Sequence, residues 1–210
     1  MSSISIIGLG SMAGALAERA LAGDNAVEFV GRDRVKAEMA SAAFDGSTVG
    51  AAGSVPAGDI VILAVPYLSA VAVVRAYGDA LRGKVIVDIT NPITPDFTGF
   101  LVSERSSGAQ QIASAAPAGA QVVKAFNTLP SEVLAAGSAR GRPLDVLLAG
   151  DDAQAKARVS RLIESMGLRP MDAGPLAMAR ALENATLLHL GLVAHAVKHS
   201  NFALGVNVLD

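Results

Sequence analysis

Apolar residues form short, nearly unbroken runs, and segments with helical spacing of apolar positions separate these runs. An unbroken apolar run is typical of a strand in a parallel sheet that is covered on both faces. The strand-like runs are residues 4–7, 26–30, 59–65, 84–89, 121–125, 144–149, 168–171 and, more weakly, 45–53. The alternation predicts an α/β fold: a doubly wound, mostly parallel Rossmann-type sheet with a small C-terminal α/β extension.

These patterns suggest two parts, a nucleotide-binding domain over residues 1–127 and a smaller C-terminal part over residues 128–210. Within the smaller part, residues 176–197 predict a long helix that is apolar around most of its circumference. Such a helix is buried in a folded protein, yet no further segment of the chain remains to cover it. We therefore expect this helix to pack on its own subunit and on a second one, which gives a homodimer.

The first strand-like run ends at two glycines in the spacing Gly8-x-Gly10-x-x-Ala13. Gly8 allows a tight turn, and Gly10 lets the backbone approach a diphosphate because it has no Cβ. Ala13 lets the following helix pack closely on the strand. Unpaired N–H groups and the helix dipole favour an anion at this helix N-terminus. The stretch predicts a dinucleotide-binding loop, and the alternative is a purely structural turn.

The end of the second strand-like run bears on the choice between NAD and NADP. Enzymes that use NAD place an acidic residue here to bind the ribose 2′-hydroxyl. In this chain Arg32 follows the strand, and Lys36 lies one helical turn later on the same side. Because a guanidinium group binds a phosphate through two hydrogen bonds, we expect Arg32 and Lys36 to bind the 2′-phosphate of NADP. Asp33 leaves a ribose contact open, and a solvated basic helix start is the other alternative.

The carboxyl ends of the first, fourth and fifth strand-like runs should meet where ligands bind in open α/β sheets. The residues that follow or end the latter two runs are Val65, Pro66, Tyr67, Asn91 and Pro92. We expect them to border a nicotinamide pocket. The alternative is ordinary turn chemistry, since proline and asparagine favour turns.

Composition excludes several other functions. The net charge of −2 gives no electrostatic reason to expect nucleic acid binding. The chain has no cysteine, so disulfides, thiol nucleophiles and zinc–thiolate sites are excluded. No signal-peptide pattern opens the sequence, and its longest apolar runs, 60–74 and 185–197, fall short of the roughly 18–20 residues of a membrane span. We expect a cytoplasmic protein without a membrane partner.

Several stretches resemble the coenzyme F420-dependent NADP oxidoreductases, a family that passes a hydride between NADP(H) and a deazaflavin. The least generic of them are residues 103–106 (SERS), 150–152 (GDD), 167–176 (GLRPMDAGPL) and 204–206 (LGV). The order of the pieces and the chain length are also similar to that family. The resemblance implies NADP as cofactor and coenzyme F420, or a related flavin-like molecule, as the acceptor.

The resemblance also implies cofactor contacts at particular positions. The diphosphate loop matches Leu9, Gly10, Ser11 and Met12, and the 2′-phosphate contacts match Arg32 and Lys36. Positions along the nucleotide and nicotinamide match Tyr67, Val71, Ile93 and Ser131, and positions where the two rings stack match Asn127 and Leu129. The chain departs from the archaeal members at Gly31, where they carry a serine, and at Asn127, where they carry a histidine.

Direct hydride transfer between two heterocycles needs little acid–base help, because the cofactors carry the chemistry. We therefore expect no catalytic side chain and no metal, and no hydrolase or metalloprotease motif occurs in the sequence. Two alternatives stay open. A reductase of a small imine or carbonyl would need a general acid, and no residue stands out for that role. A non-catalytic NADP(H)-sensing protein could be built on the same fold.

Two smaller features of the C-terminal part also lead to predictions. His195 and His199 are spaced to share one face of the last helix, as a surface or interface pair or, alternatively, a metal site. Asp172 precedes that helix and is expected to cap it.

Overall fold

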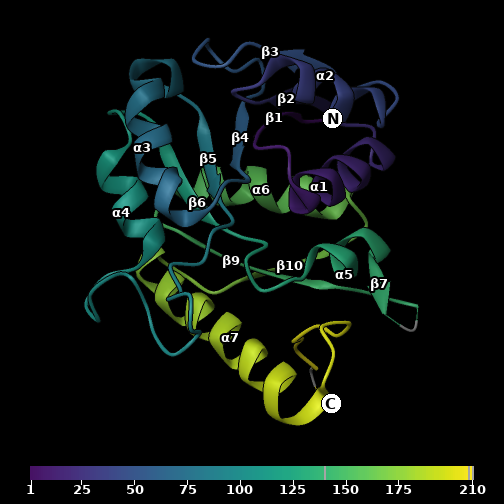
Figure 1. Ribbon diagram of the computed structural model, residues 1–210, viewed down its shortest axis with the longest axis vertical. Coiled ribbons are helices and arrows are strands. Elements are labelled where there is room, and N and C mark those ends of the chain that lie inside the picture. The colour runs from purple at the N-terminus through teal and green to yellow at the C-terminus, as the bar shows by residue number, and fades with distance from the viewer. Residues whose placement is uncertain (140, 208, 210) are drawn as a thin grey trace.

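The computed structural model describes residues 1–139, 141–207 and 209 (Figure 1). Its main sheet has eight strands: β1 (Ser3–Ile7), β2 (Ala26–Val30), β3 (Thr48–Gly50), β4 (Ile60–Leu63), β5 (Val85–Asp88), β6 (Gln121–Lys124), β9 (Asp145–Gly150) and β10 (Arg169–Asp172). The α-helices are α1 (Ser11–Ala22), α2 (Arg34–Ala42), α3 (Tyr67–Tyr77), α4 (Gly108–Ala115), α5 (Ser131–Ala136), α6 (Ala153–Ser165) and α7 (Ala179–Leu192).

The strands follow the order β10-β9-β6-β5-β4-β1-β2-β3, and all neighbours are parallel except β6 and β9. This arrangement confirms the predicted α/β class and the doubly wound sheet. The chain turns back at β1, which lies between β4 and β2, so the carboxyl ends of β1 and β4 form the point where strand order reverses. The two strands of the C-terminal part, β9 and β10, continue the same sheet beyond β6.

Side chains of the central strands alternate between two hydrophobic cores, as expected for strands covered on both faces. In β4, Ile60 and Ile62 join the core beneath α1 and α6, whereas Val61 and Leu63 join the core beneath α3 and α4. All four residues are at most 1% exposed. This packing explains the unbroken apolar run in the sequence, and it fixes the strand ends that carry the candidate site.

The last helix covers the predicted range but is not uniform. A 3₁₀ turn (Leu176–Met178) leads into α7, and a π-helical turn (Val193–Val197) ends it at Lys198, whose φ is +66°. His199 therefore follows the helix end, and the prediction that it shares a helix face with His195 is wrong. Leu188 of α7 is 57% exposed, so part of the apolar surface of α7 stays uncovered within one subunit.

The carboxylate that reaches the start of this last helical segment is a different one from that predicted. The Leu176 N–H donates to Oδ1 of Asp151 at 2.8 Å. Asp172 instead accepts the N–H of Gly174 at 2.8 Å and pairs with Lys156 at 2.9 Å. The predicted capping role of Asp172 is thus wrong, because its carboxylate is used within its own turn and by α6.

Three short elements are absent from the sequence-based expectations: helix α5, the 3₁₀ turn η1 (Gly78–Leu81), and a two-stranded ribbon of β7 (Ser138–Ala139) and β8 (Arg142–Pro143). Conversely, the weak run at residues 45–53 contributes only β3. Across the described part of the chain, no helix is both long and apolar enough to span a bilayer.

Candidate functional site

The glycine loop between β1 and α1 has the geometry that its spacing predicts. Gly8 has a φ of +130°, and a Cβ built there would lie 2.0 Å from the carbonyl oxygen of Ala64, so only glycine fits. Ala13 is fully buried where α1 crosses the sheet. At Gly10, in contrast, a Cβ would meet no atom within 4 Å. The space in front of Gly10 is open, and a ligand could approach the bare backbone there.

Helix α1 begins at this open space without a cap from the protein. Gly10 is its N-cap residue, no side chain accepts a hydrogen bond from its first turn, and no acidic residue lies in that turn. Ser11 is exposed and Met12 half-buried. Free N–H groups and the helix dipole therefore favour an anion at this end of α1.

Two cationic side chains border a neighbouring depression of about 490 Å³, whose lining also includes Leu9, Gly31 and Asp33. Arg32 is exposed, and within the described residues it has no ion pair or side-chain hydrogen bond. Asp33 caps α2 by accepting the Lys36 N–H at 3.2 Å, and its other oxygen lies 4.0 Å from Lys36 Nζ. With two cationic side chains and one carboxylate in its lining, this depression carries a net positive charge.

Gly31 explains how the loop closes on the second strand. A Cβ at Gly31 would lie 2.5 Å from Cδ1 of Leu9. The Leu9 side chain therefore occupies the space into which a side chain at position 31 would project. Gly31 is thus required by the packing of Leu9 against the end of the second strand.

An apolar depression of about 490 Å³ lies next to the cationic one, between the ends of β1 and β2 and helix α3. Its lining includes Gly8, Arg32, Val65, Pro66, Leu68 and Tyr77. A mostly apolar wall with a cation at its edge suits a flat aromatic ring that carries a phosphate nearby.

A third depression, of about 300 Å³, lies at the ends of β4 and β5, and its lining includes Pro66, Tyr67, Thr90, Asn91, Ile93 and Leu101. The expected residues Pro66, Tyr67, Asn91 and Ile93 are thus brought together. Asn127 joins them through hydrogen bonds, since its Nδ2 donates to Asn91 Oδ1 at 3.0 Å and Asn91 Nδ2 donates to the Asn127 carbonyl at 3.0 Å.

Asn127 also connects this region to α7. Its Nδ2 lies within hydrogen-bonding distance of the Leu182 carbonyl at 2.9 Å and of Thr186 Oγ1 at 3.1 Å, and the Thr186 hydroxyl donates to the Asn127 carbonyl at 3.0 Å. Oδ1 of Asn127 is buried and has no hydrogen-bond partner among the described residues. An unpaired buried acceptor is costly, and any donor that reached this oxygen would offset that cost.

The other residues expected to contact the cofactor are buried or half-buried. Leu129 is 5% exposed in the core beneath α1 and α6, Pro92 is buried, and Val71 packs on the core beneath α3 and α4. Ser131 is half-buried at the first residue of α5. A direct ligand contact of Leu129 would require a local rearrangement.

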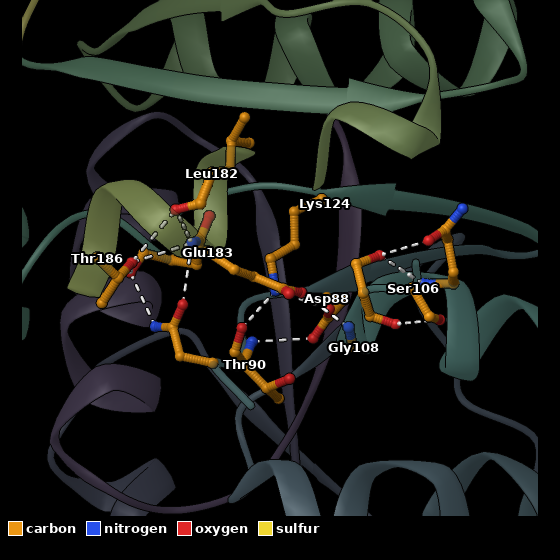
Figure 2. Close-up of polar contacts among 12 residues, drawn as sticks. Asp88, Thr90, Ser106, Gly108, Lys124, Leu182, Glu183 and Thr186 are labelled. Carbon is orange, nitrogen blue, oxygen red and sulfur yellow. Dashed lines mark hydrogen bonds and ion pairs between the residues drawn. The ribbon is translucent and has the colours of Figure 1, made fainter. Parts of the chain in front are cut away.

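A cluster of charged side chains that the sequence reasoning missed contacts Thr90, which lines this third depression (Figure 2). Lys124 Nζ lies 2.8 Å from Asp88 Oδ2 and 3.4 Å from Glu183 Oε1, and all three side chains are fully buried. Burial raises the pKa of the Glu183 carboxyl, and Asp88 adds to the increase while Lys124 opposes it. A lysine within the apolar strand β6 and a glutamate within an apolar helix were the signals that could have revealed the cluster.

The chain is similar to known proteins in sequence and in fold. A family model described as NADP oxidoreductase, coenzyme F420-dependent, matches residues 3–92. The F420-dependent NADP reductase of Methanothermobacter thermautotrophicus is 30% identical over 179 residues, which cover 81% of this chain and 72% of that protein. The chain belongs to this family. A solved structure of a proposed F420-dependent NADP reductase from Arthrobacter sp. FB24 covers 99% of the chain with a TM-score of 0.86 and 24% identity, which shows that the two share a fold.

A relative with a different activity shares part of the chain. Metalloreductase STEAP3 from rat is 41% identical over 105 residues, which are 50% of this chain and 20% of STEAP3. The chain thus spans only about a fifth of that relative's length. For this member of the F420-dependent NADP reductase family, the acceptor must be inferred from its own site.

Proposed function

We propose that this protein is an oxidoreductase that transfers a hydride between NADP(H) and a deazaflavin, coenzyme F420, or a related flavin-like acceptor. The observation that carries the proposal is the uncapped N-terminus of α1, open at Gly10 and adjacent to the unpaired Arg32. An anion-binding helix end beside a second cationic site matches a dinucleotide that carries an additional phosphate.

The proposed site has residues that could hold each part of NADP. The N–H groups of the first turn of α1 would hold the diphosphate, and Arg32 with Lys36 would hold the 2′-phosphate. The apolar wall beside α3 would cover the adenine ring. When bound, the cofactor supplies the hydride, and the protein supplies its position and electrostatic surroundings.

The third depression would hold the reactive ends of the two molecules. Tyr67, Ile93 and Leu101 offer apolar surface for flat rings, and Asn91 offers polar contacts. The unpaired Oδ1 of Asn127 could accept a hydrogen bond from an amide or a ring N–H. These groups would hold the rings at the near-attack distance of about 3–3.5 Å that hydride transfer needs.

We also propose that the protein is a homodimer joined through the last helix. Leu188 and Val197 are 57% and 37% exposed, and both are large apolar side chains of this segment. Light scattering at micromolar concentration should give twice the mass of the chain. A monomer at that concentration would refute the proposed assembly.

The activity can be tested by following NADPH absorbance with one acceptor at a time. The purified protein is mixed with NADPH and with a deazaflavin, FMN or a cyclic imine. Oxidation with the deazaflavin, and little or none with the imine, is expected. Oxidation with the imine alone would identify an imine reductase. Tight NADPH binding without oxidation by any of the three would favour a sensing protein.

A further inference from the structure

The buried charged cluster connects four elements of the fold, β5, β6, α4 and α7. The Lys124 ammonium on β6 contacts Asp88, Glu183 and the Thr90 carbonyl oxygen, so each of its three hydrogens has an acceptor. Oδ1 of Asp88 accepts the Thr90 N–H at 2.8 Å. Glu183 Oε1 on α7 accepts the N–H of Gly108, the first residue of α4, at 2.9 Å (Figure 2).

The charges in this cluster do not balance. Two carboxyl groups face a single ammonium group, and water reaches none of them. The second oxygen of Glu183, Oε2, has no hydrogen-bond partner among the described residues. When both acids are ionised, the cluster carries an excess negative charge in a medium of low dielectric constant, where charges act strongly at a distance.

The surroundings of Glu183 identify it as the member of the cluster whose charge changes with pH. The groups that face it are Lys124 from β6, Asp88 from β5, the backbone of Gly108 from α4, and the Tyr67 ring from α3. On its own helix, Arg180 lies one turn earlier with its guanidinium 3.9 Å from the centre of the Phe100 ring. Lys124 is thus the one cation among the described groups in contact with the carboxylate.

The cluster lies directly against residues that line the third depression. A methyl group at Gly108 would lie 3.0 Å from Cε2 of Tyr67 and 3.2 Å from Oε1 of Glu183, so ring and carboxylate flank the same glycine. Lys124 contacts Thr90, which lines the depression next to Asn91. The excess charge therefore lies just beneath the floor of the site.

We propose that Glu183 is a positioning residue that acts electrostatically, and that its ionised carboxylate favours bound NADP⁺ over bound NADPH. The inference rests on the proposed function, because it places the nicotinamide over the third depression. When NADPH gives up a hydride, which is one proton and two electrons, its ring changes from neutral to cationic. A negative charge beneath the ring stabilises the cationic product and so assists hydride donation.

The sign of the pH dependence follows from the geometry. A protonated Glu183 adds no charge to the cluster, and because burial raises its pKa, this neutral form persists to higher pH than in an exposed glutamate. At higher pH the carboxyl ionises, and the ratio of NADP⁺ affinity to NADPH affinity should rise. Two unit charges about 10 Å apart, in an effective dielectric constant of roughly 20–40, change such a ratio by about fourfold to fifteenfold. Titration of the 2′-phosphate cancels in the ratio, because both nucleotides carry it.

The test is to measure both dissociation constants while pH rises from the ordinary glutamate value of 4.5, because the pKa of Glu183 is raised above it. NADPH binding is followed by its fluorescence, and NADP⁺ binding by competition. The wild-type ratio should rise with pH, and Glu183→Gln should abolish the rise while keeping the acceptor for the Gly108 N–H. Glu164→Gln, an exposed glutamate on α6, is the matched control and should behave as wild type.

A second variant removes the neighbouring charge that acts on Glu183 and leaves Glu183 itself in place. Asp88→Asn removes the like charge that opposes ionisation of Glu183, so the rise should move to lower pH. It also keeps the proposal testable if Glu183→Gln does not fold. A wild-type ratio that is constant with pH, or one that rises equally in Glu183→Gln, would overturn the proposal while leaving NADP binding intact. Failure of both nucleotides to bind would refute the proposed function as well.

Discussion

Replacement of Arg32 by alanine separates the 2′-phosphate interaction from the rest of cofactor binding. The Arg32 side chain is exposed and makes no ion pair within the described residues, so its loss should not affect folding. A hydrogen bond between charged groups contributes about 1.5–3 kcal/mol. Because solvent screens an exposed site, we expect the low end, about 1.5 kcal/mol, or roughly tenfold weaker NADPH binding.

Isothermal titration calorimetry with NADPH and NADH measures this effect directly. NADH lacks the phosphate, so its affinity for Arg32→Ala should match that for wild type. Arg34→Ala is the matched control, since Arg34 lies two residues away and its guanidinium pairs with Glu38 at 2.8 Å. This control should change NADPH affinity by less than about twofold, as expected for an exposed pair. Equal losses for NADPH and NADH in Arg32→Ala would refute the role assigned to Arg32.

Three further predictions concern single positions. Gly10→Ala should fold normally, because its methyl group meets no atom, but should weaken NADPH binding at least about tenfold by obstructing the diphosphate. Gly99→Ala, also in open space, is the control for calorimetry and thermal unfolding. Asp145→Asn should cost about 1–3 kcal/mol in urea unfolding at neutral pH and speed amide exchange at Val206, whose N–H donates to Asp145; an unchanged exchange rate would contradict this. The Arg169 hydrogen bond lowers the pKa of Asp145 below its usual 3.8, so this stabilisation is present above that pH and is lost as pH falls through the folded value. The pKa of Glu183 is raised above 4.5, so wild type should lose stability relative to Glu183→Gln as pH rises through the folded value; a constant difference across pH would contradict burial of this carboxyl.

The glycine loop could be predicted from sequence because its requirements are local. Gly8 needs a positive φ and Gly10 needs open space, and both demands are visible as residue types at a fixed spacing. The unbroken apolar runs likewise predicted the strands, since a strand that is buried on both faces has no polar position. These two local signals were enough to indicate the α/β class and the place of the cofactor loop.

The features that escaped prediction depend on contacts between distant segments. Asp151 and Asp172 both precede the last helix, and only the packing of β9 against its start shows that Asp151 reaches Leu176. The helix end at Lys198 depends on a π-helical turn that apolar periodicity does not reveal. Lys124 and Glu183 lie 59 positions apart, so a charged residue in each apolar element indicates that it needs a partner but not which residue that partner is.

The most direct test of the account is the crystal structure of the protein with NADPH. We expect the diphosphate against the N-terminus of α1 at Gly10, and the 2′-phosphate between Arg32 and Lys36. The nicotinamide should lie over the depression bordered by Tyr67 and Asn91. A complex in which side chains close the space before Gly10, or in which the phosphate points away from Arg32, would contradict the central claim.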